Sequence, residues 1–397
     1  MPWRVNDLMS QRYEFCQLAL TSCVTFSALC QQFDISRQTG YKWLQRFQEE
    51  GCAGLSDRSR RPKHSPRRID PAVEEQVLRL RQQYPYWGPR KLRRLLDDLT
   101  SPTQLPAVVT VARILKRHGL TALRPSQQPD WPAVQRFAAP GPNDLWQMDL
   151  KAALRLSDGS KIYPVGLLDD HSRYLLGLWV LPHQTDDRIL ACWIEAARSY
   201  GLPRRTLTDH GPQFRTEDET TSAFRTYLWA CGVRHIQGRG AHPQTQGKIE
   251  RFWRTLNTEV ITRHSYGDLA SWQRCLDDWR SRYNHLRPHQ ELGDEPPISR
   301  YRPSPRPYVE PDRYKRLGRP DSLYRRVNPK GEIILGGWRL TVGRGFAGWV
   351  VEARPGNGGY WRVYFRERFV REFRITQPVA MGSRLRAKWG NPTACPT

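Results

Sequence analysis

The spacing of apolar residues changes from helical to alternating at residue 145, and this change constrains the fold more than any other feature. From Leu145 to Ala152 apolar and polar residues alternate, which is the period of a strand. Two more apolar strands follow, and helices then alternate with short strands. The expected elements are strands at 145–152, 162–168, 174–181, 206–209 and 233–236, and helices at 189–197, 224–231 and after 246. This order predicts a mixed α/β domain built on one sheet.

Three acidic residues lie where such a domain would bring distant segments together. Asp149 projects from the polar face of the first strand, and Asp209 ends a short strand before the turn at 211–212. Functional sites of open α/β sheets gather at the carboxyl ends of strands. Beyond residue 246, apolar residues at helical spacing define a buried stripe, with Glu250 on a neighbouring face. We therefore expect this helix to bring Glu250 beside Asp149 and Asp209.

These carboxylates predict a site for divalent metal. Hard oxygen ligands suit Mg²⁺, for which Mn²⁺ would substitute, and two ions roughly 3.5–4 Å apart serve phosphoryl transfer on nucleic acids. Because the chain holds 39 acidic residues among 397, a solvated set with convenient spacing is the alternative. Asp144, Asp169 and Asp170 lie near the same sheet edge, either as secondary ligands or as residues that cap turns and hold the fold.

Five motifs, taken in order, favour the metal-site interpretation. They are Trp146-Gln147-Met148-Asp149, Leu168 to Arg173, Thr208-Asp209-His210-Gly211, Pro243 to Arg251, and Tyr283 to His289. With these motifs the chain resembles the DDE transposases of bacterial insertion sequences, which share the integrase catalytic core of retroviruses. The resemblance spans nearly the whole chain. It implies a ribonuclease-H-like core at 143–301 in which Asp149, Asp209 and Glu250 are catalytic and bind two Mg²⁺ ions.

The chain departs from this family at two points near the second acid. His210 stands where Asn is usual, and more residues than is customary separate Asp209 from Glu250. We expect the surplus to form a polar loop at 215–221. Neither departure removes a ligand.

Residues 1–56 are typical of a helix-turn-helix module. Ser36 is placed to cap a second helix, which Gly51 ends. This would be the recognition helix, and the residues at its start that suit base edges and phosphates in the major groove are Arg37, Gln38, Thr39 and Lys42. A small helical bundle with a charged outer face is the alternative.

Two further basic segments precede the core. Residues 57–69 form a proline-containing linker in which Arg58, Arg60 and Arg61 are placed to follow DNA, although a solvated hinge would have the same composition. Residues 70–120 are typical of a second helix-turn-helix module, begun by an Asp-Pro cap, with Arg90 and Lys91 on a basic helix. A connector at 121–142 leads to the core.

Basic residues also flank the third acid and fill the C-terminal part. Lys248, Arg251 and Arg254 are expected to hold phosphates near the metal, or to balance the charge of Glu250. After a linker at 302–324, short β-rich runs predict a small barrel at 325–378. The resemblance implies an SH3-like barrel that binds DNA or a partner subunit. Residues 379–397 are expected to form a basic tail.

Composition limits the partners and the compartment. A formal net charge of +24 predicts a polyanionic partner, although RNA-binding proteins share such a charge. The eight cysteines form no CxxC pair, which favours a reduced compartment over a zinc site. No apolar run approaches the roughly 20 residues of a membrane span. We expect a soluble cytoplasmic protein, nucleoid-associated on double-stranded DNA, and by the resemblance a homodimer or larger assembly.

The sequence thus predicts a DNA transposase that binds the terminal inverted repeats of its element and catalyses metal-dependent strand cleavage and transfer into target DNA. A DNA-binding regulator built from the same modules is one alternative, although a regulator has no need of intact acids. A ribonuclease-H-like nuclease acting on RNA:DNA hybrids is the other. Two helix-turn-helix modules favour duplex DNA instead.

The charge generates a first prediction. Because Lys and Arg contacts to phosphates release counterions, the affinity for duplex DNA should fall at least about a thousandfold between roughly 50 and 200 mM salt. Fluorescence anisotropy with labelled duplex checks this. An affinity that changes less than tenfold over the same range would contradict it.

Overall fold

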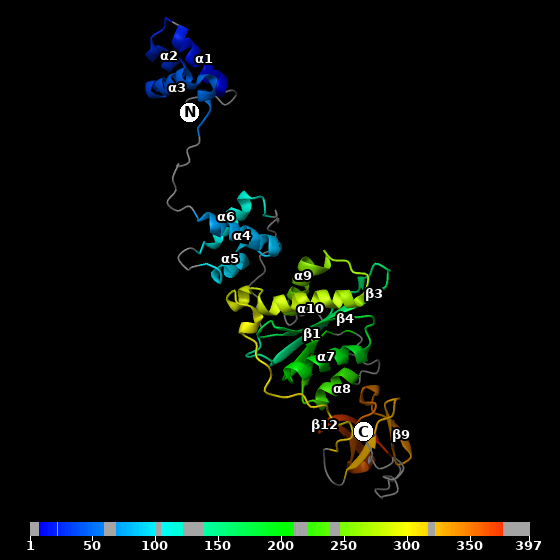
Figure 1. The fold of residues 1–397 in the computed structure, drawn as a ribbon. Helices are drawn as coiled ribbons and strands as arrows, with labels where there is room; N and C mark the ends of the chain where they lie inside the picture. The colour runs from blue at the N-terminus through cyan, green and yellow to red at the C-terminus, as the bar shows by residue number, and fades with distance from the viewer. Residues whose placement is uncertain are drawn as a thin grey trace. The chain divides into compact units, whose positions relative to one another are not determined.

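The computed structural model describes residues 8–21, 23–58, 69–100, 105–121, 138–209, 211, 214, 221–238, 247–316 and 322–375. The chain divides into two compact units, Met1–Arg68 and Ile69–Thr397 (Figure 1). Predictions for Arg60, Arg61, His210, the 215–220 loop and the 379–397 tail lie outside the described residues. No helix among those described combines the length and apolar character needed to cross a membrane.

The first unit is a helical domain with the predicted caps. Its helices are α1 (Leu8–Thr21), α2 (Phe26–Gln32) and α3 (Arg37–Glu50), followed by the 3₁₀ turn η1 (Gly51–Leu55). The Ser36 hydroxyl accepts the Thr39 N–H at 3.2 Å, and Gly51 ends α3 with a φ of 61°. Phe15, Trp43 and Leu55 centre its core. The prediction of a second helix begun by Ser36 is confirmed.

The second unit opens with another group of three helices. They are α4 (Pro71–Gln83), α5 (Pro89–Asp97) and α6 (Val108–Arg117). The Asp70 carboxylate accepts the Ala72 N–H at 2.9 Å, which confirms the predicted Asp-Pro start of α4. Val77, Leu92 and Leu115 lie in the core that these helices share, and Leu286 from the end of the central domain packs against it.

One sheet organises the central domain. Its strands are β1 (Leu145–Leu150), β2 (Leu154–Arg155), β3 (Lys161–Asp169), β4 (Leu175–Leu181), β5 (Arg205–Thr208) and β6 (Arg234–Gln237). The sheet order is β2-β3-β1-β5-β6, with β4 also paired to β3. The first strands run antiparallel, whereas β1, β5 and β6 are parallel. The predicted order of strands and helices is confirmed, and only the short β2 was not expected.

Helices cover both faces of this sheet (Figure 1). On one face, α7 (Asp186–Tyr200) and α8 (Ala223–Ala230) bury a core that includes Trp146 and Met148. On the other lie α9 (Gly247–Leu256), a π-helical turn (Asn257–Ile261) and α10 (Leu269–His285). The apolar residues Trp272, Leu276, Trp279 and Tyr283 of α10 are buried in this second core.

The C-terminal part is built from two open sheets. The strands are β7 (Leu323–Arg326), β8 (Glu332–Leu335), β9 (Trp338–Thr341), β10 (Val350–Pro355), β11 (Tyr360–Phe365) and β12 (Arg368–Arg374). One sheet has the order β12-β11-β10-β7, and β8 pairs with β9 in the other. The prediction of a closed SH3-like barrel is therefore not confirmed.

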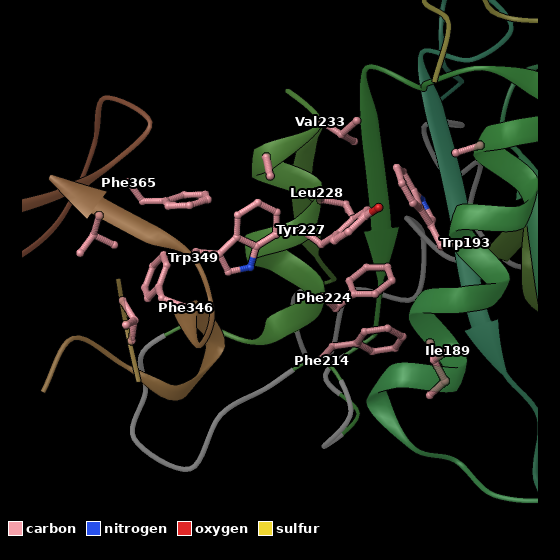
Figure 2. Close-up of a cluster of buried hydrophobic side chains, with 14 of the residues drawn as sticks. Ile189, Trp193, Phe214, Phe224, Tyr227, Leu228, Val233, Phe346, Trp349 and Phe365 are labelled. Atoms are coloured by element: carbon pink, nitrogen blue, oxygen red, sulfur yellow. The ribbon is translucent and has the colours of Figure 1, made fainter. Parts of the chain in front are cut away.

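The C-terminal sheets and the central domain share one hydrophobic core. Figure 2 shows Trp349 and Phe346 of the C-terminal part facing Tyr227 of α8, behind which the aromatic cluster continues to Trp193. The Tyr227 and Trp349 rings meet edge to face, with centroids 6.1 Å apart. Arg366 adds polar anchoring by donating to the Ala230 carbonyl at 2.6 Å. The connecting segment also packs on the core, where the Tyr308 and Tyr227 hydroxyls lie 2.6 Å apart.

This contact generates a second prediction. A Cβ built on Gly345 would lie 1.6 Å from the carbonyl oxygen of Thr221, so Gly345→Ala must push the two parts of the core apart. We expect a loss of about 2–4 kcal/mol in the free energy of unfolding, measured by urea denaturation. Gly88→Ala is the matched control, because no atom lies within 4 Å of its Cβ position. Equal, small effects of both changes would contradict the shared core.

Candidate active site

The parallel pairing of β1 with β5 places two of the predicted acids side by side. Gln147 is paired with Leu207, and two residues further along each strand stand Asp149 and Asp209. Both acids therefore lie at the carboxyl edge of the sheet, where the sequence placed them. Asp209 follows the end of β5, and its Oδ1 accepts the Gly211 N–H at 2.9 Å.

The third acid lies in the first turn of α9, and two side-chain contacts hold this helix against β1. The Ile249 N–H donates to Gln147 Oε1 at 3.3 Å, and Trp253 Nε1 donates to Asp149 Oδ2 at 2.9 Å. Glu250 lies between these two anchors on the exposed side of the helix. The helix thus runs along β1 from Gln147 to Asp149.

A glycine on the neighbouring strand permits this close packing. Gly166 of β3 is paired with Asp149, and a Cβ at this position would lie 3.0 Å from both Phe252 and Trp253. The indole ring of Trp253 therefore packs close to the bare backbone of Gly166, and its N–H reaches the Asp149 carboxylate.

The other two acids contribute to the electrostatics of Asp149. Burial, with the negative charges of Asp209 and Glu250 adding to it, raises the pKa of Asp149 to about 6, and the Trp253 hydrogen bond opposes this rise. Even so, no group of three or more His, Cys, Asp or Glu side chains in the described part of the chain is arranged to hold one metal ion. The acids lie within electrostatic reach of one another without forming a closed cluster.

Asp169 and Asp170 do not share the sheet edge of Asp149, contrary to expectation. Strand β3 runs antiparallel to β1 and pairs Asp169 with Trp146, so these two acids, like Asp144, lie at the amino end of β1, where they hold the fold. Asp169 and Asp170 are fully buried. Asp169 accepts the backbone N–H of Asn143 at 2.7 Å and of Ser172 at 2.8 Å. Asp144 accepts the Gly141 N–H at 3.0 Å. The sequence allowed these acids to be either secondary metal ligands or residues that cap turns and hold the fold. The structure shows the second role.

The Tyr283 to His289 motif is likewise structural. The Asn284 side chain bonds both the N–H of Leu175 at 2.8 Å and its carbonyl at 3.0 Å, which fixes the start of β4 to α10. Arg287 pairs with Glu259 at 3.1 Å, and both side chains are largely buried. The motif thus ties α10 and the π-helical turn to the sheet.

The predicted DNA contacts of the first unit lie at the start of α3. Arg37, Gln38 and Lys42 are exposed there, and Thr39 is half-buried beside the Ser36 cap. Arg58 pairs with Glu50. Contact between these residues and DNA stays a prediction.

Elsewhere, several predicted DNA contacts already have protein partners. Arg90 pairs with Asp294 at 2.6 Å, and Lys91 is half-buried, with its pKa lowered by burial to about 7. Lys248 bonds Asp170 rather than facing outward. Arg251 and Arg254 are exposed on α9. A DNA contact stays a prediction for all five residues. Within this set, and among the described residues, Arg251 and Arg254 alone combine an exposed side chain with the absence of an ion pair.

Sequence reasoning missed the residues that fix the acids. The apolar stripe after residue 246 and the alternation in β1 do not indicate that Trp253 donates to Asp149 or that Gln147 accepts the Ile249 N–H. The available signal was the position of Gln147 two residues before Asp149 on one face of a strand. A polar side chain at that position needs a hydrogen-bond partner in the element that covers this face of the sheet.

Comparisons with known proteins identify the same types of domain. Integrase core domain profiles match residues 139–243 and 231–297, a homeodomain-like profile matches 39–115, and a helix-turn-helix profile matches 11–63. The chain is 28% identical over 249 residues to an uncharacterized protein of insertion element IS476 from Xanthomonas euvesicatoria, covering 62% of this chain and 69% of that protein.

Two more distant relatives point the same way. A protein of insertion element IS407 from Burkholderia multivorans is 28% identical over 47% of this chain and 62% of its own length. The transposase of transposon Tn552 from Staphylococcus aureus is 20% identical over 64% of this chain. The chain covers 56% of that transposase, and thus less than two thirds of either relative.

The chain is therefore a helix-turn-helix protein with an integrase core. It carries integrase core domains and is similar to proteins of bacterial insertion elements.

The raised pKa of Asp149 generates a third prediction. The folded protein holds the Asp149 proton more tightly than the unfolded chain, so the resulting stabilisation is present below the ordinary aspartate pKa and is lost as pH rises through about 6. Without divalent metal, Asp149→Asn should therefore melt a few degrees above the wild type at about pH 7.5 and show no gain near pH 4. Differential scanning calorimetry checks this. Asp158→Asn, at an exposed turn, is the control and should show no gain at neutral pH.

Proposed function

We propose that this protein binds the terminal inverted repeats of an insertion sequence and catalyses metal-dependent DNA strand cleavage and strand transfer. The observation that supports the proposal is the placement of Asp149 and Asp209 at one sheet edge, with the charges of Asp209 and Glu250 both adding to the raised pKa of Asp149. Acids that repel one another at such an edge suit a site that gains its counter-charge from bound cations.

The donor set fits divalent metal. All three side chains are carboxylates, the oxygen ligands that Mg²⁺ and Mn²⁺ take, and Asp149 is destabilised as an anion until positive charge arrives. In our proposal Asp149, Asp209 and Glu250 hold two ions. When bound, such ions activate an attacking hydroxyl and stabilise the leaving oxygen of a phosphodiester.

The protein's own residues would orient this chemistry. Trp253 donates to Asp149 Oδ2 and so orients this carboxylate at the sheet edge. The Gly211 N–H engages Asp209 Oδ1 in the same way. Each hydrogen bond limits the rotation of a carboxylate, so the ligand atoms are oriented before substrate arrives. Exposed Arg251 and Arg254 would hold phosphates beside Glu250.

DNA recognition is assigned to the helical modules. In the first, Arg37, Gln38, Thr39 and Lys42 at the start of α3 would read the major groove. Because two element ends have to be joined, we propose a dimer or larger assembly on double-stranded DNA. The working compartment would be the bacterial cytoplasm, at the nucleoid.

A fourth prediction tests the proposal. Using labelled DNA that carries the ends flanking the gene, the wild type should nick the ends and transfer strands only with Mg²⁺ or Mn²⁺. Asp149→Ala, Asp209→Ala and Glu250→Gln should each reduce the rate at least about a thousandfold, because each removes a ligand. End binding by all three variants should stay within about threefold of the wild type.

The controls separate the alternatives. Cleavage that survives in all three variants would refute the assignment of the acids. Tight end binding without cleavage by the wild type would identify a DNA-binding regulator, and cleavage confined to RNA:DNA hybrids would identify a nuclease. Glu291→Gln, an exposed acid outside the site, should retain wild-type cleavage.

A further inference from the structure

A buried polar network lies directly behind the third acid. Gln147 is 1% exposed and Asp170 is 0% exposed, although both are polar. Gln147 Nε2 donates to Asp170 Oδ1 at 2.7 Å, and Lys248 Nζ donates to Asp170 Oδ2 at 2.5 Å and to the Asp170 carbonyl at 3.0 Å. The Ala139 N–H completes the set on Oδ2 at 2.7 Å.

Gln147 carries this network into the helix of Glu250. Its Oε1 accepts the N–H of Ile249, one of the first-turn donors of α9 that have no partner within the helix. Both ends of one buried amide are thus used, one on Asp170 and the other on α9. A side chain from β1 therefore caps the helix that carries Glu250.

Lys248 holds the same turn of α9 through a second contact with Asp170. Its side chain is 17% exposed, and its ammonium bonds two oxygens of Asp170. Glu250 lies two residues further on, so Lys248 and Ile249, which both reach the network, directly precede it. To contact a DNA phosphate, Lys248 would have to leave a fully buried carboxylate without its cation, which is costly.

We propose that Gln147, Asp170 and Lys248 are positioning residues that set the first turn of α9, and with it the Glu250 carboxylate, relative to Asp149. Lys248 then acts through Asp170 instead of through a DNA phosphate. The inference rests on the proposed function for the role of Glu250, but its geometry is independent of DNA.

The test uses the full-length protein with Lys248→Met and Asp170→Asn, which keep most side-chain volume. The matched control is Arg254→Met on the same helix, which removes an exposed cation outside the network. Three quantities are measured: hydrogen exchange of residues 247–256 without metal or DNA, Mn²⁺ affinity without DNA, and end binding as a function of salt.

Both network variants should speed hydrogen exchange of α9 about fivefold or more and weaken Mn²⁺ binding about 10–100-fold, with end binding within about threefold of the wild type. Arg254→Met should instead weaken end binding and reduce the magnitude of the salt slope by about one. Lys248→Arg, which keeps the pair, should recover most of the Mn²⁺ affinity. The double variant should lose no more than the worse single variant, since both break one network.

The opposite pattern would overturn the inference. If Lys248→Met weakens end binding and lowers the salt slope while α9 exchange and Mn²⁺ affinity stay unchanged, Lys248 is a phosphate contact. If Asp170→Asn does not fold, the Lys248→Met and Lys248→Arg pair decides alone. Failure of the wild type to cleave DNA would count against the proposed function, whereas α9 exchange in the variants would still decide on positioning.

Discussion

The packing of α9 against β1 is the interaction on which the candidate site depends. Helix α9 is distant from β1 in the sequence, yet Ile249 and Trp253 of this helix each donate a hydrogen bond to a side chain of that strand. The bare backbone of Gly166 leaves room for the indole ring. Without this contact Glu250 would be one more exposed acid on a helix, and Asp149 would lose both its indole donor and one of the charges that raise its pKa.

Local periodicity was enough to predict the central domain. Alternation at 145–152 and helical spacing after 246 describe which face of each element is apolar, and a sheet covered on both faces is the arrangement that buries them. The placement of Asp149 and Asp209 followed from the same reasoning, because residues at the ends of adjacent parallel strands share one edge.

What the sequence did not predict is which surfaces meet. Lys248 and Arg90 have the composition of DNA contacts, but their partners, Asp170 and Asp294, are 78 and 204 residues away. No local pattern encodes such pairs. The expected barrel is not confirmed for a related reason. Strands β8 and β9 pair with each other, and the short β-rich runs of the sequence do not specify whether the strands close into a barrel.

The aromatic core between α8 and the C-terminal sheets has a mechanical consequence. A domain on a loose tether samples many distances from its neighbour, whereas Trp349 and Phe346 are locked into the same packed interior as Trp193 of the central domain. The exposed arginines of β11 and β12 are thus held at a fixed distance from the sheet edge that bears Asp149 and Asp209. A partner molecule that contacts both domains would therefore have to match a spacing that is set by side-chain packing.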